Sequence, residues 1–434
     1  MSALPRKLPQ AEREALRRGW CPSTLKPMET GDGWLVRLHP PGALLTPTGL
    51  RRVATLAAEH GNGLVEISAR ANLQIRGVTP ESHPVLVQRL LAEGLLDEHG
   101  GDGPQRLTLV SPLAERAGGL IDAVALAERI EMRGRAIAGL PPKLSIVVDD
   151  GGANSLDATA CDLRLVGVAE AALTLKLAER RWHGPLSETE AAKTVTSILR
   201  SFANLRRAVP ERIRRLRDLS DEALASLTNL PEIAAPTRRP DPRRAGLFEM
   251  ADGRFAALVG LPFGRCDAAT LDRLAEGLVP DSEIRFSPWR GLAFRGLDRA
   301  RAERLLGLAH SLGLIVSDDD PRLSVQACAG SPACSRAEAT TMADAARLAE
   351  AAADLLAQGL TLHASGCVKS CAHPGTADLT LVGREGRYDV VLGGTTRDKP
   401  LATLDLPGLL ARLQPGQDIH ARLNEAVRKT GPRG

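Results

Sequence analysis

The fold of this chain is decided by residues 31–78, which read GDGWLVRLHPPGALLTPTGLRRVATLAAEHGNGLVEISARANLQIRGV. Residues 251–297 resemble this stretch and read ADGRFAALVGLPFGRCDAATLDRLAEGLVPDSEIRFSPWRGLAFRGL. When the two are aligned, Arg76 falls on Arg295. Self-similarity over so long a period indicates one structural unit that occurs twice in the chain.

Each copy shows the same order of hydrophobic patterns. A strand pattern comes first, followed by a helix pattern, two further strand patterns and a second helix pattern. This order predicts a ferredoxin-like half, and two such halves can pair about a pseudo-twofold axis. A helix-then-strands region follows each half, and DLRLVG at 162–167 matches DLTLVG at 378–383. The predicted fold class is therefore α+β and internally duplicated, with two ferredoxin-like halves and two α/β domains.

The 434 residues suit about three domains of ordinary size, and the patterns divide them further. The predicted segments are an N-terminal extension (1–30), ferredoxin-like half 1 (31–100), an α/β domain without a cluster (101–230), a linker (231–248), ferredoxin-like half 2 (249–317) and an α/β domain with a cluster (318–434).

Four cysteines in the last quarter of the chain are candidate metal ligands. Cys328 and Cys334 are spaced C-x5-C in ACAGSPAC, and Cys367 and Cys371 are spaced C-x3-C in GCVKSC. Four thiolates are what a [4Fe-4S] cluster requires. The small residues around the first pair let the backbone approach a bulky cluster. The spacing favours an iron–sulfur cluster in the second α/β domain only.

Two other interpretations of these cysteines stay open. A structural zinc site also takes four cysteines, although its paired ligands usually have two to four residues between them. The four thiols can also be unligated. A disulfide requires an oxidising compartment, and the first residues show no apolar segment typical of a signal peptide. The remaining cysteines, Cys21, Cys161 and Cys266, occur singly and are expected to be small buried hydrophobic residues.

Composition excludes several classes of function. The net charge of +4 is too small to indicate nucleic-acid binding, and 3% aromatic residues leave few rings for stacking on bases. Neither G-x-G-x-x-G after a strand nor G-x-x-x-x-G-K-[ST] occurs, so these nucleotide-binding motifs are absent. No apolar run approaches membrane-spanning length. We expect a soluble, cytoplasmic protein with no nucleic-acid or membrane partner.

The duplicated half and the two cysteine pairs resemble the sirohaem-type nitrite and sulfite reductase family over almost the whole chain. Within this family the narrower likeness is to the precorrin-3B synthases. Four blocks carry it: RGWCPSTLKPMETGDG (18–33), SARANLQIRG (68–77), SIVVDDGG (145–152) and HASGCVKSCAHPG (363–375). The first and last blocks are the most specific, because sirohaem reductases differ there.

The resemblance implies roles for individual residues. The cluster ligands of the family fall on Cys328, Cys334, Cys367 and Cys371. Its tetrapyrrole-binding and anion-binding cations fall on Arg70, Arg106 and Lys143. Guanidinium and ammonium groups suit the many carboxylates at the rim of a tetrapyrrole. The alternative for each of these three cations is an ordinary surface charge.

Departures from the reductase pattern suggest a different use of the pocket. Reductases carry a second lysine where this chain has Ser145, and Pro-Asn where it has Val368 and Lys369. Loss of a cation weakens a site for a small oxyanion. The pocket is therefore expected to hold a metal-free tetrapyrrole as substrate.

The activity implied by the resemblance is an O2-dependent monooxygenation in aerobic cobalamin biosynthesis. Precorrin-3A is hydroxylated at a meso carbon and a ring-A acetate closes as a γ-lactone. A [4Fe-4S] cluster suits this reaction because it transfers one electron at a time. The resemblance implies NADH as an indirect electron source, acting through a separate reductase. The residues that activate oxygen are not identified by the sequence.

Several alternatives remain at this point. His363 and His373 flank the second cysteine pair, and they are either ligands of an additional iron, proton shuttles or structural residues. The alternative functions are a sirohaem-dependent nitrite or sulfite reductase and a non-catalytic iron–sulfur electron carrier. Sirohaem is a cofactor only under the reductase alternative.

Overall fold

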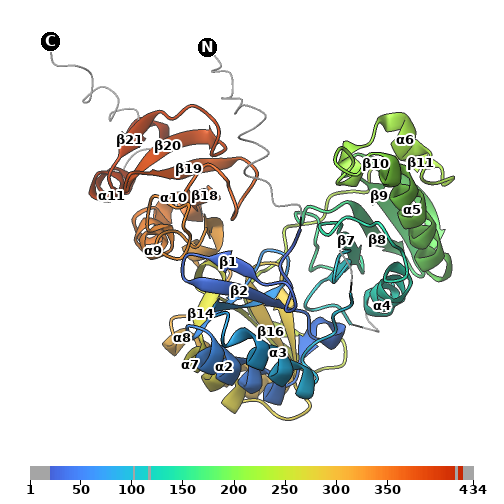
Figure 1. The fold of residues 1–434 in the computed structure, drawn as a ribbon, viewed down its shortest axis with the longest axis horizontal. Coiled ribbons are helices and arrows are strands. Elements are labelled where there is room, and N and C mark those ends of the chain that lie inside the picture. The colour runs from blue at the N-terminus through green and yellow to red at the C-terminus, as the bar shows by residue number, and fades with distance from the viewer. Residues whose placement is uncertain (1–19, 101–102, 116–118, 416–418, 424–434) are drawn as a thin grey trace.

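The computed structural model describes residues 20–100, 103–115, 119–415 and 419–423. It contains four β-sheets, two in the paired halves and one in each of two α/β domains (Figure 1). Among the described residues, none of the helices combines the length and the apolar character needed to span a lipid bilayer.

The two halves have equivalent five-stranded sheets. The sheet of half 1 has the order β1 (Met28–Thr30), β2 (Gly33–Leu38), β5 (Leu73–Val78), β4 (Leu64–Ile67) and β14 (Arg265–Asp267). The sheet of half 2 has the order β12 (Gly246–Glu249), β13 (Phe255–Gly260), β16 (Gly291–Leu297), β15 (Glu283–Ser287) and β3 (Leu44–Leu45). Each half therefore lends one short strand to the other sheet, which ties the two copies together.

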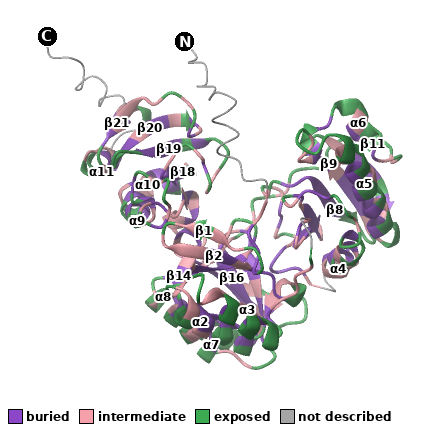
Figure 2. Ribbon diagram, in the orientation of Figure 1, coloured by how far each residue is buried: buried purple, intermediate pink, exposed green. Residues whose placement is uncertain are grey.

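The halves also share one hydrophobic core. Helices α2 (Pro47–His60), α3 (His83–Ala92), α7 (Ala268–Glu276) and α8 (Arg299–Ser311) cover the sheets (Figure 1). Thr46 caps α2 by accepting a hydrogen bond from the Gly49 N–H at 3.0 Å, and Asp267 caps α7 in the same way through Thr270. Leu50 and Leu271 on the inner faces of these helices are buried in the same cluster, whereas the outer faces are exposed (Figure 2).

The first α/β domain is a six-stranded sheet. Its order is β11 (Glu232–Ile233), β10 (Arg181–Ser187), β9 (Ala172–Leu177), β8 (Leu163–Ala169), β7 (Ile146–Asp149) and β6 (Thr108–Val110), and its helices are α4 (Ala123–Gly134), α5 (Glu188–Ala208) and α6 (Asp221–Ala225). Strands β6, β7 and β8 are parallel, and β9 and β10 return antiparallel.

The second α/β domain repeats this topology with five strands. The order is β17 (Val325–Ala327), β18 (Leu362–Ser365), β19 (Ala377–Arg384), β20 (Arg387–Gly394) and β21 (Ala402–Leu404), and its helices are α9 (Thr341–Ala351), α10 (Ala353–Ala357) and α11 (Leu406–Leu413). Strands β17, β18 and β19 are parallel, and β20 and β21 are antiparallel. The duplicated α+β fold predicted from the sequence is confirmed.

Some details differ from the expected segments. Strand β1 lies within residues 1–30, which the sequence assigned to an N-terminal extension, and β11 lies within the expected linker. The exchange of β3 and β14 was not predicted, because strands of two and three residues leave no periodic pattern. The proposed domain boundaries otherwise stay a prediction.

Candidate cluster site and cationic pocket

The two cysteine pairs lie on adjacent loops. Strands β17 and β18 are parallel neighbours, so the loops that follow them leave the same edge of the sheet. Cys328 follows β17 directly, and Cys367 comes two residues after β18. The loops are hydrogen-bonded to each other: the Cys328 N–H donates to the Ala364 carbonyl at 3.2 Å, and the Gly366 N–H donates to Cys328 Sγ at 3.1 Å.

Close backbone packing explains the small residues in these loops. Gly330 has a φ of +69°, and a Cβ there would lie 2.5 Å from Thr341 Oγ1. A Cβ on Gly366 would lie 2.6 Å from the Ala337 Cβ. The Cys334 N–H donates to the Gly330 carbonyl at 2.8 Å, which turns the first loop back on itself. The sequence predicted that these small residues let the backbone approach a cluster, and that approach stays a prediction.

The four thiols lie near enough to one another to interact electrostatically. Burial raises the pKa of Cys371, and repulsion by the sulfurs of Cys367, Cys328 and Cys334 raises it further, while Lys369 opposes the shift. Burial and repulsion by Cys328 and Cys334 likewise raise the pKa of Cys367. The sulfurs are therefore close enough to interact electrostatically. Loading a metal here requires these thiols to lose their protons.

Four cysteine thiols on two hydrogen-bonded loops are a donor set that suits a metal centre. Within the described ranges, no group of three or more His, Cys, Asp or Glu side chains is placed to hold a metal ion. Zinc draws its thiolates to about 2.3 Å from one centre, whereas the four corners of an iron–sulfur cube hold them further apart. The chemistry of four thiols suits either centre, and the five-residue gap between Cys328 and Cys334 favours the cluster. The ligand assignment itself stays a prediction.

A group of cations borders the cysteine loops. The pKa of Lys143 is lowered by burial and by repulsion from Lys369, Arg215 and Arg70, although Cys21 opposes the shift. Burial also lowers the pKa of Arg70, with a further contribution from Arg215. We call Arg70, Lys143, Arg215 and Lys369 the cationic pocket. Lys369 lies between Cys367 and Cys371, so the pocket adjoins the cluster site.

Arg106 does not join this group. Burial lowers its pKa, and attraction by Glu131 opposes the shift. Its Nε donates to the Thr108 carbonyl at 3.0 Å. Both Arg106 and Arg37 repel His39, so Arg106 lies beside the pocket rather than in the cluster of cations that contains Arg70 and Lys143.

Sequence reasoning missed three of the cations here. Arg37 donates to Gln74 Oε1 from Nε at 3.0 Å and from Nη2 at 2.8 Å. Arg215 forms a bidentate contact with Asp162 at 2.8 Å. Lys369 was noted only as a departure from the reductase pattern. Charge alone does not distinguish Arg37 and Arg215 from ordinary surface arginines, and only the fold brings them together.

The solitary cysteines separate into two kinds. Cys161 and Cys266 are buried, as predicted, and burial raises the pKa of both thiols. The prediction of burial was wrong for Cys21, which is only half-buried. Its side chain interacts electrostatically with Arg37, Arg70 and Lys143. A polar environment formed by distant residues therefore surrounds a cysteine whose local sequence gives no sign of it.

His363 is fully buried on β18. Burial, His373 and Arg290 lower its pKa to about 4. The rings of His363 and His373 meet edge to face, with centroids 5.6 Å apart. Neither ring nitrogen of His363 has a hydrogen-bond partner among the described residues. His363 is therefore neutral at pH 7, and an additional iron at this pair of histidines stays a prediction.

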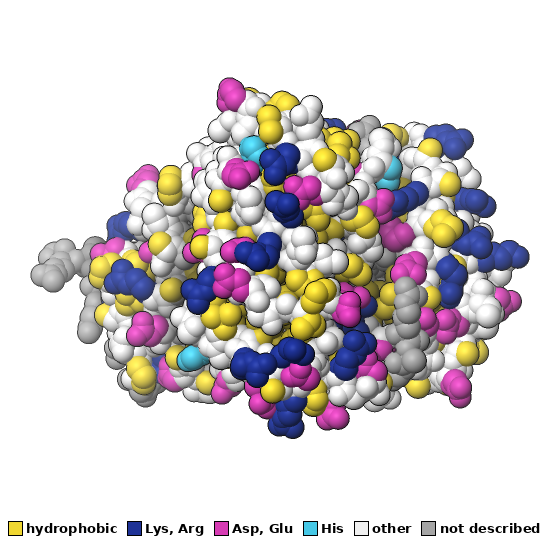
Figure 3. Space-filling model, turned by 90° about the horizontal axis from the view of Figure 1, so that it is seen from below, with side chains coloured by type: hydrophobic (Ala, Val, Ile, Leu, Met, Phe, Trp, Pro, Cys, Tyr) yellow, Lys and Arg dark blue, Asp and Glu magenta, His cyan; other side chains and the backbone are white. Residues whose placement is uncertain are grey.

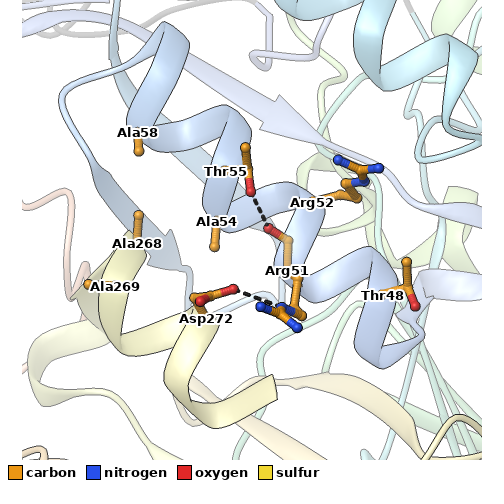
Figure 4. A pocket seen from close by; sticks show the side chains of 9 residues that line it. All are labelled: Thr48, Arg51, Arg52, Ala54, Thr55, Ala58, Ala268, Ala269 and Asp272. Atoms are coloured by element: carbon orange, nitrogen blue, oxygen red, sulfur yellow. Dashed lines mark hydrogen bonds and ion pairs between the residues drawn. The ribbon is translucent and has the colours of Figure 1, made fainter. Parts of the chain in front are cut away.

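A groove lies elsewhere on the molecule. It has a volume of about 600 Å³ and runs between α2 and α7 (Figure 4). Arg51 Nε contacts Asp272 Oδ1 across it at 3.0 Å. These helices lie on the side of the paired sheets away from both α/β domains (Figure 1). Cations and carboxylates are interspersed over the face seen from below, so no charge of one sign dominates it (Figure 3).

Comparisons with known proteins agree with this architecture. The nitrite/sulfite reductase ferredoxin-like half domain matches residues 26–93. The structure of the NirA protein of Mycobacterium tuberculosis superposes with a TM-score of 0.68 at 21% identity, covering 91% of this chain and 83% of that one. This likeness supports the fold.

Sequence similarity to curated proteins identifies the family of the chain more closely. The ferredoxin–nitrite reductase of Synechococcus elongatus is 28% identical over 34% of this chain and 30% of its own length. The precorrin-3B synthase of Sinorhizobium sp is 33% identical over 97% of this chain and 91% of its own length. The chain therefore belongs to the precorrin-3B synthase family.

Proposed function

We propose that this protein is an oxygen-dependent monooxygenase that converts precorrin-3A into precorrin-3B in aerobic cobalamin biosynthesis. The observation that supports this most is that the charge of Lys369 acts both on Lys143 of the cationic pocket and on Cys371 of the four-thiol site. A polyanionic substrate held by the pocket would lie next to the source of electrons. The homology with a precorrin-3B synthase over 97% of the chain supports the same substrate.

The pocket residues bind and orient the substrate. Within the cationic pocket, Arg70, Lys143 and Lys369 have no carboxylate at ion-pair distance among the described residues, so they can bind substrate carboxylates. Arg215 is already held by Asp162, which keeps its guanidinium in place at the pocket. Burial is the main cause of the lowered pKa values of Lys143 and Arg70, and repulsion between neighbouring cations adds to it; a bound polyanion would offset that repulsion.

Cys328, Cys334, Cys367 and Cys371 would hold a [4Fe-4S] cluster. When bound, such a cluster supplies single electrons, which triplet dioxygen needs in order to react with a closed-shell substrate. The overall reaction takes O2, two electrons and two protons, and it yields the hydroxylated substrate and water. NADH acting through a separate reductase would be the electron source, an additional iron is a further candidate cofactor, and the cytoplasm is the proposed location.

Conversion of precorrin-3A tests the proposal. Anaerobically purified protein should contain iron and acid-labile sulfide, lack the intense visible bands of sirohaem, and consume precorrin-3A only when both O2 and a reductant are present. A protein that binds sirohaem, reduces sulfite or nitrite, and leaves precorrin-3A unchanged would instead support the reductase alternative, for which the match to nitrite reductases over a third of the chain is the supporting observation.

A further inference from the structure

Arg76 of half 1 contacts the first cysteine loop directly. It lies on β5, its side chain is 3% exposed, and it donates from Nη2 to the Ala333 carbonyl at 3.0 Å. The peptide bond of that carbonyl continues into Cys334. The Gly31 N–H donates to the same carbonyl at 3.1 Å. Half 1 is therefore hydrogen-bonded to the loop that carries two of the four cysteines.

Carboxylates hold the Arg76 guanidinium in this position. Asp32 accepts from Arg76 Nε at 2.9 Å and from Nη2 at 2.6 Å, and Glu66 accepts from Nη1 at 3.3 Å. Burial alone would lower the pKa of Arg76, but these two partners raise it. Arg265, on the strand that half 2 contributes, also donates to Glu66 at 2.6 Å. The positive charges of Arg76 and Arg265 thus balance the negative charges of Asp32 and Glu66.

The hydrogen bonds continue from Arg76 to the cationic pocket. Gln74 Nε2 donates to Glu66 Oε2 at 3.1 Å, and Gln74 Oε1 accepts from Arg37 at 2.8 Å. Arg37 in turn interacts with Arg70 of the pocket. We call the series Arg37, Gln74, Glu66 and Arg76 the polar ladder. It runs across β2, β5 and β4 from the pocket to the cysteine loop.

Half 2 has an equivalent of Arg76 that binds a loop of an α/β domain, but it lacks the polar ladder. Arg295 donates to the carbonyls of Pro112 and Ala114 at 3.2 and 2.7 Å, in the loop after β6 of the first α/β domain. The strand registers place Leu258, Ala293 and Arg285 where half 1 has Arg37, Gln74 and Glu66. Leu258 and Ala293 are fully buried and apolar. Among the described residues of the two halves, the ladder occurs only in half 1, where the loop that the arginine holds carries cysteines.

We propose that Arg76 is the positioning residue for the Cys328–Cys334 loop, and that the polar ladder transmits occupancy of the cationic pocket to a cluster held by that loop. The proposal rests on the cluster assigned under the proposed function. Arg76 fixes the carbonyl next to Cys334, and its charge balances Asp32 close to the site. A ligand that displaces Arg37 also displaces Gln74 and Glu66, which are hydrogen-bonded in series. Because Glu66 accepts a hydrogen bond from Arg76, the position of Arg76 changes as well.

Redox titration of the anaerobic holoenzyme tests the positioning role. Arg76→Gln should lower the midpoint potential of the cluster, because it leaves Asp32 and Glu66 with one cation fewer. Loss of iron to a chelator should become about tenfold faster, as expected for the loss of one charge-assisted hydrogen bond. Arg76→Lys should restore the potential while only partly slowing iron loss. Arg295→Gln, the matched variant in the other half, should leave both measurements unchanged.

Each result bears on a separate claim. Arg76→Gln and Arg76→Lys variants that matched Arg295→Gln in both measurements would overturn the positioning role. If Arg76→Gln does not fold, Arg76→Lys alone decides, because faster iron loss at an unchanged potential is the predicted result and no change is the contradictory one. Wild-type protein without iron and sulfide would overturn the proposed function and this inference together.

A second measurement tests the ladder. Uroporphyrin, a metal-free tetrapyrrole with eight carboxylates, serves as the probe at a saturating concentration. It should lower the midpoint potential in the wild type, and the shift should be smaller in Gln74→Leu, which removes the link between Arg37 and Glu66. Binding of the probe, followed by its fluorescence, should persist in this variant. An equal shift in both proteins, or no shift in the wild type, would overturn the transmission.

Discussion

The two α/β domains have the same strand order but carry different loops at the same edge. After β6 and β7, the first domain has Ser111 and the Asp150–Gly151 turn, and Asp149 is engaged by Arg239 at 2.6 Å. After β17 and β18, the second domain has four cysteines. The contrast teaches that the sheet supplies only the placement of two adjacent loops, whereas the residues in them decide the chemistry.

The largest effect is expected for the four paired cysteines. Changing any one of Cys328, Cys334, Cys367 or Cys371 to serine should abolish the cluster or make it labile, since a hydroxyl rarely replaces a thiolate ligand. Iron and acid-labile sulfide analysis would detect the loss. Cys161→Ala and Cys266→Ala serve as controls and should keep the full complement. If all four serine variants retained it as well, the ligand assignment would be wrong.

Introducing one residue of the ladder into half 2 should destabilise the fold. Leu258 is fully buried and occupies the position of Arg37. Leu258→Arg places a cation opposite Ala293, which offers no acceptor side chain, so we expect a loss of about 3–5 kcal/mol in the free energy of unfolding. Arg37→Leu should cost only about 1 kcal/mol. Denaturant unfolding that showed equal costs would contradict the claimed asymmetry.

Replacing a residue by its equivalent in the other copy also tests His363. Its equivalent in the first α/β domain is Val147. Its pKa is depressed to about 4 in the folded protein, against about 6.5 when unfolded. Stability from this group is therefore complete above pH 6.5 and lost as pH falls through 4, with a span of up to about 3 kcal/mol. His363→Val should remove that slope. An unchanged slope of unfolding free energy against pH would show that other groups cause it.

The smallest effects are expected at the pocket. Arg70→Ala or Lys143→Ala should weaken binding of a carboxylate-rich tetrapyrrole by about 1.5–3 kcal/mol per contact, with the cluster intact. Fluorescence titration with uroporphyrin would measure this. Arg51→Ala, on the groove between α2 and α7, is the control and should bind normally. Arg106→Ala should weaken binding less than Lys143→Ala does. The reverse order would show that the tetrapyrrole binds closer to Arg106 than to Lys143.

The duplicated fold could be predicted from the sequence because the repeat extends over long, regularly patterned elements. The sequence placed the two cysteine pairs in one site because four thiolates are what a [4Fe-4S] cluster requires. In contrast, the exchanged strands β3 and β14 are too short to leave a pattern.

Contacts between distant residues explain what the sequence left out of the site. Arg76 and Ala333 are 257 positions apart and belong to different copies of the repeat. Arg215 and Lys369 come from separate domains, and only the fold brings both near enough to Lys143 to lower its pKa. Cys21 was misjudged for the same reason, since its cationic neighbours are Arg37, Arg70 and Lys143.

Oxygen-isotope labelling is the most direct test of the central claim. The anaerobic holoenzyme would be mixed with precorrin-3A, a reductant and dioxygen labelled with oxygen-18, and the tetrapyrrole product analysed by mass spectrometry. The account predicts one labelled oxygen atom in the product and none in a parallel reaction under argon. A product without label, or unchanged precorrin-3A beside a cluster that is present and reduced, would contradict it.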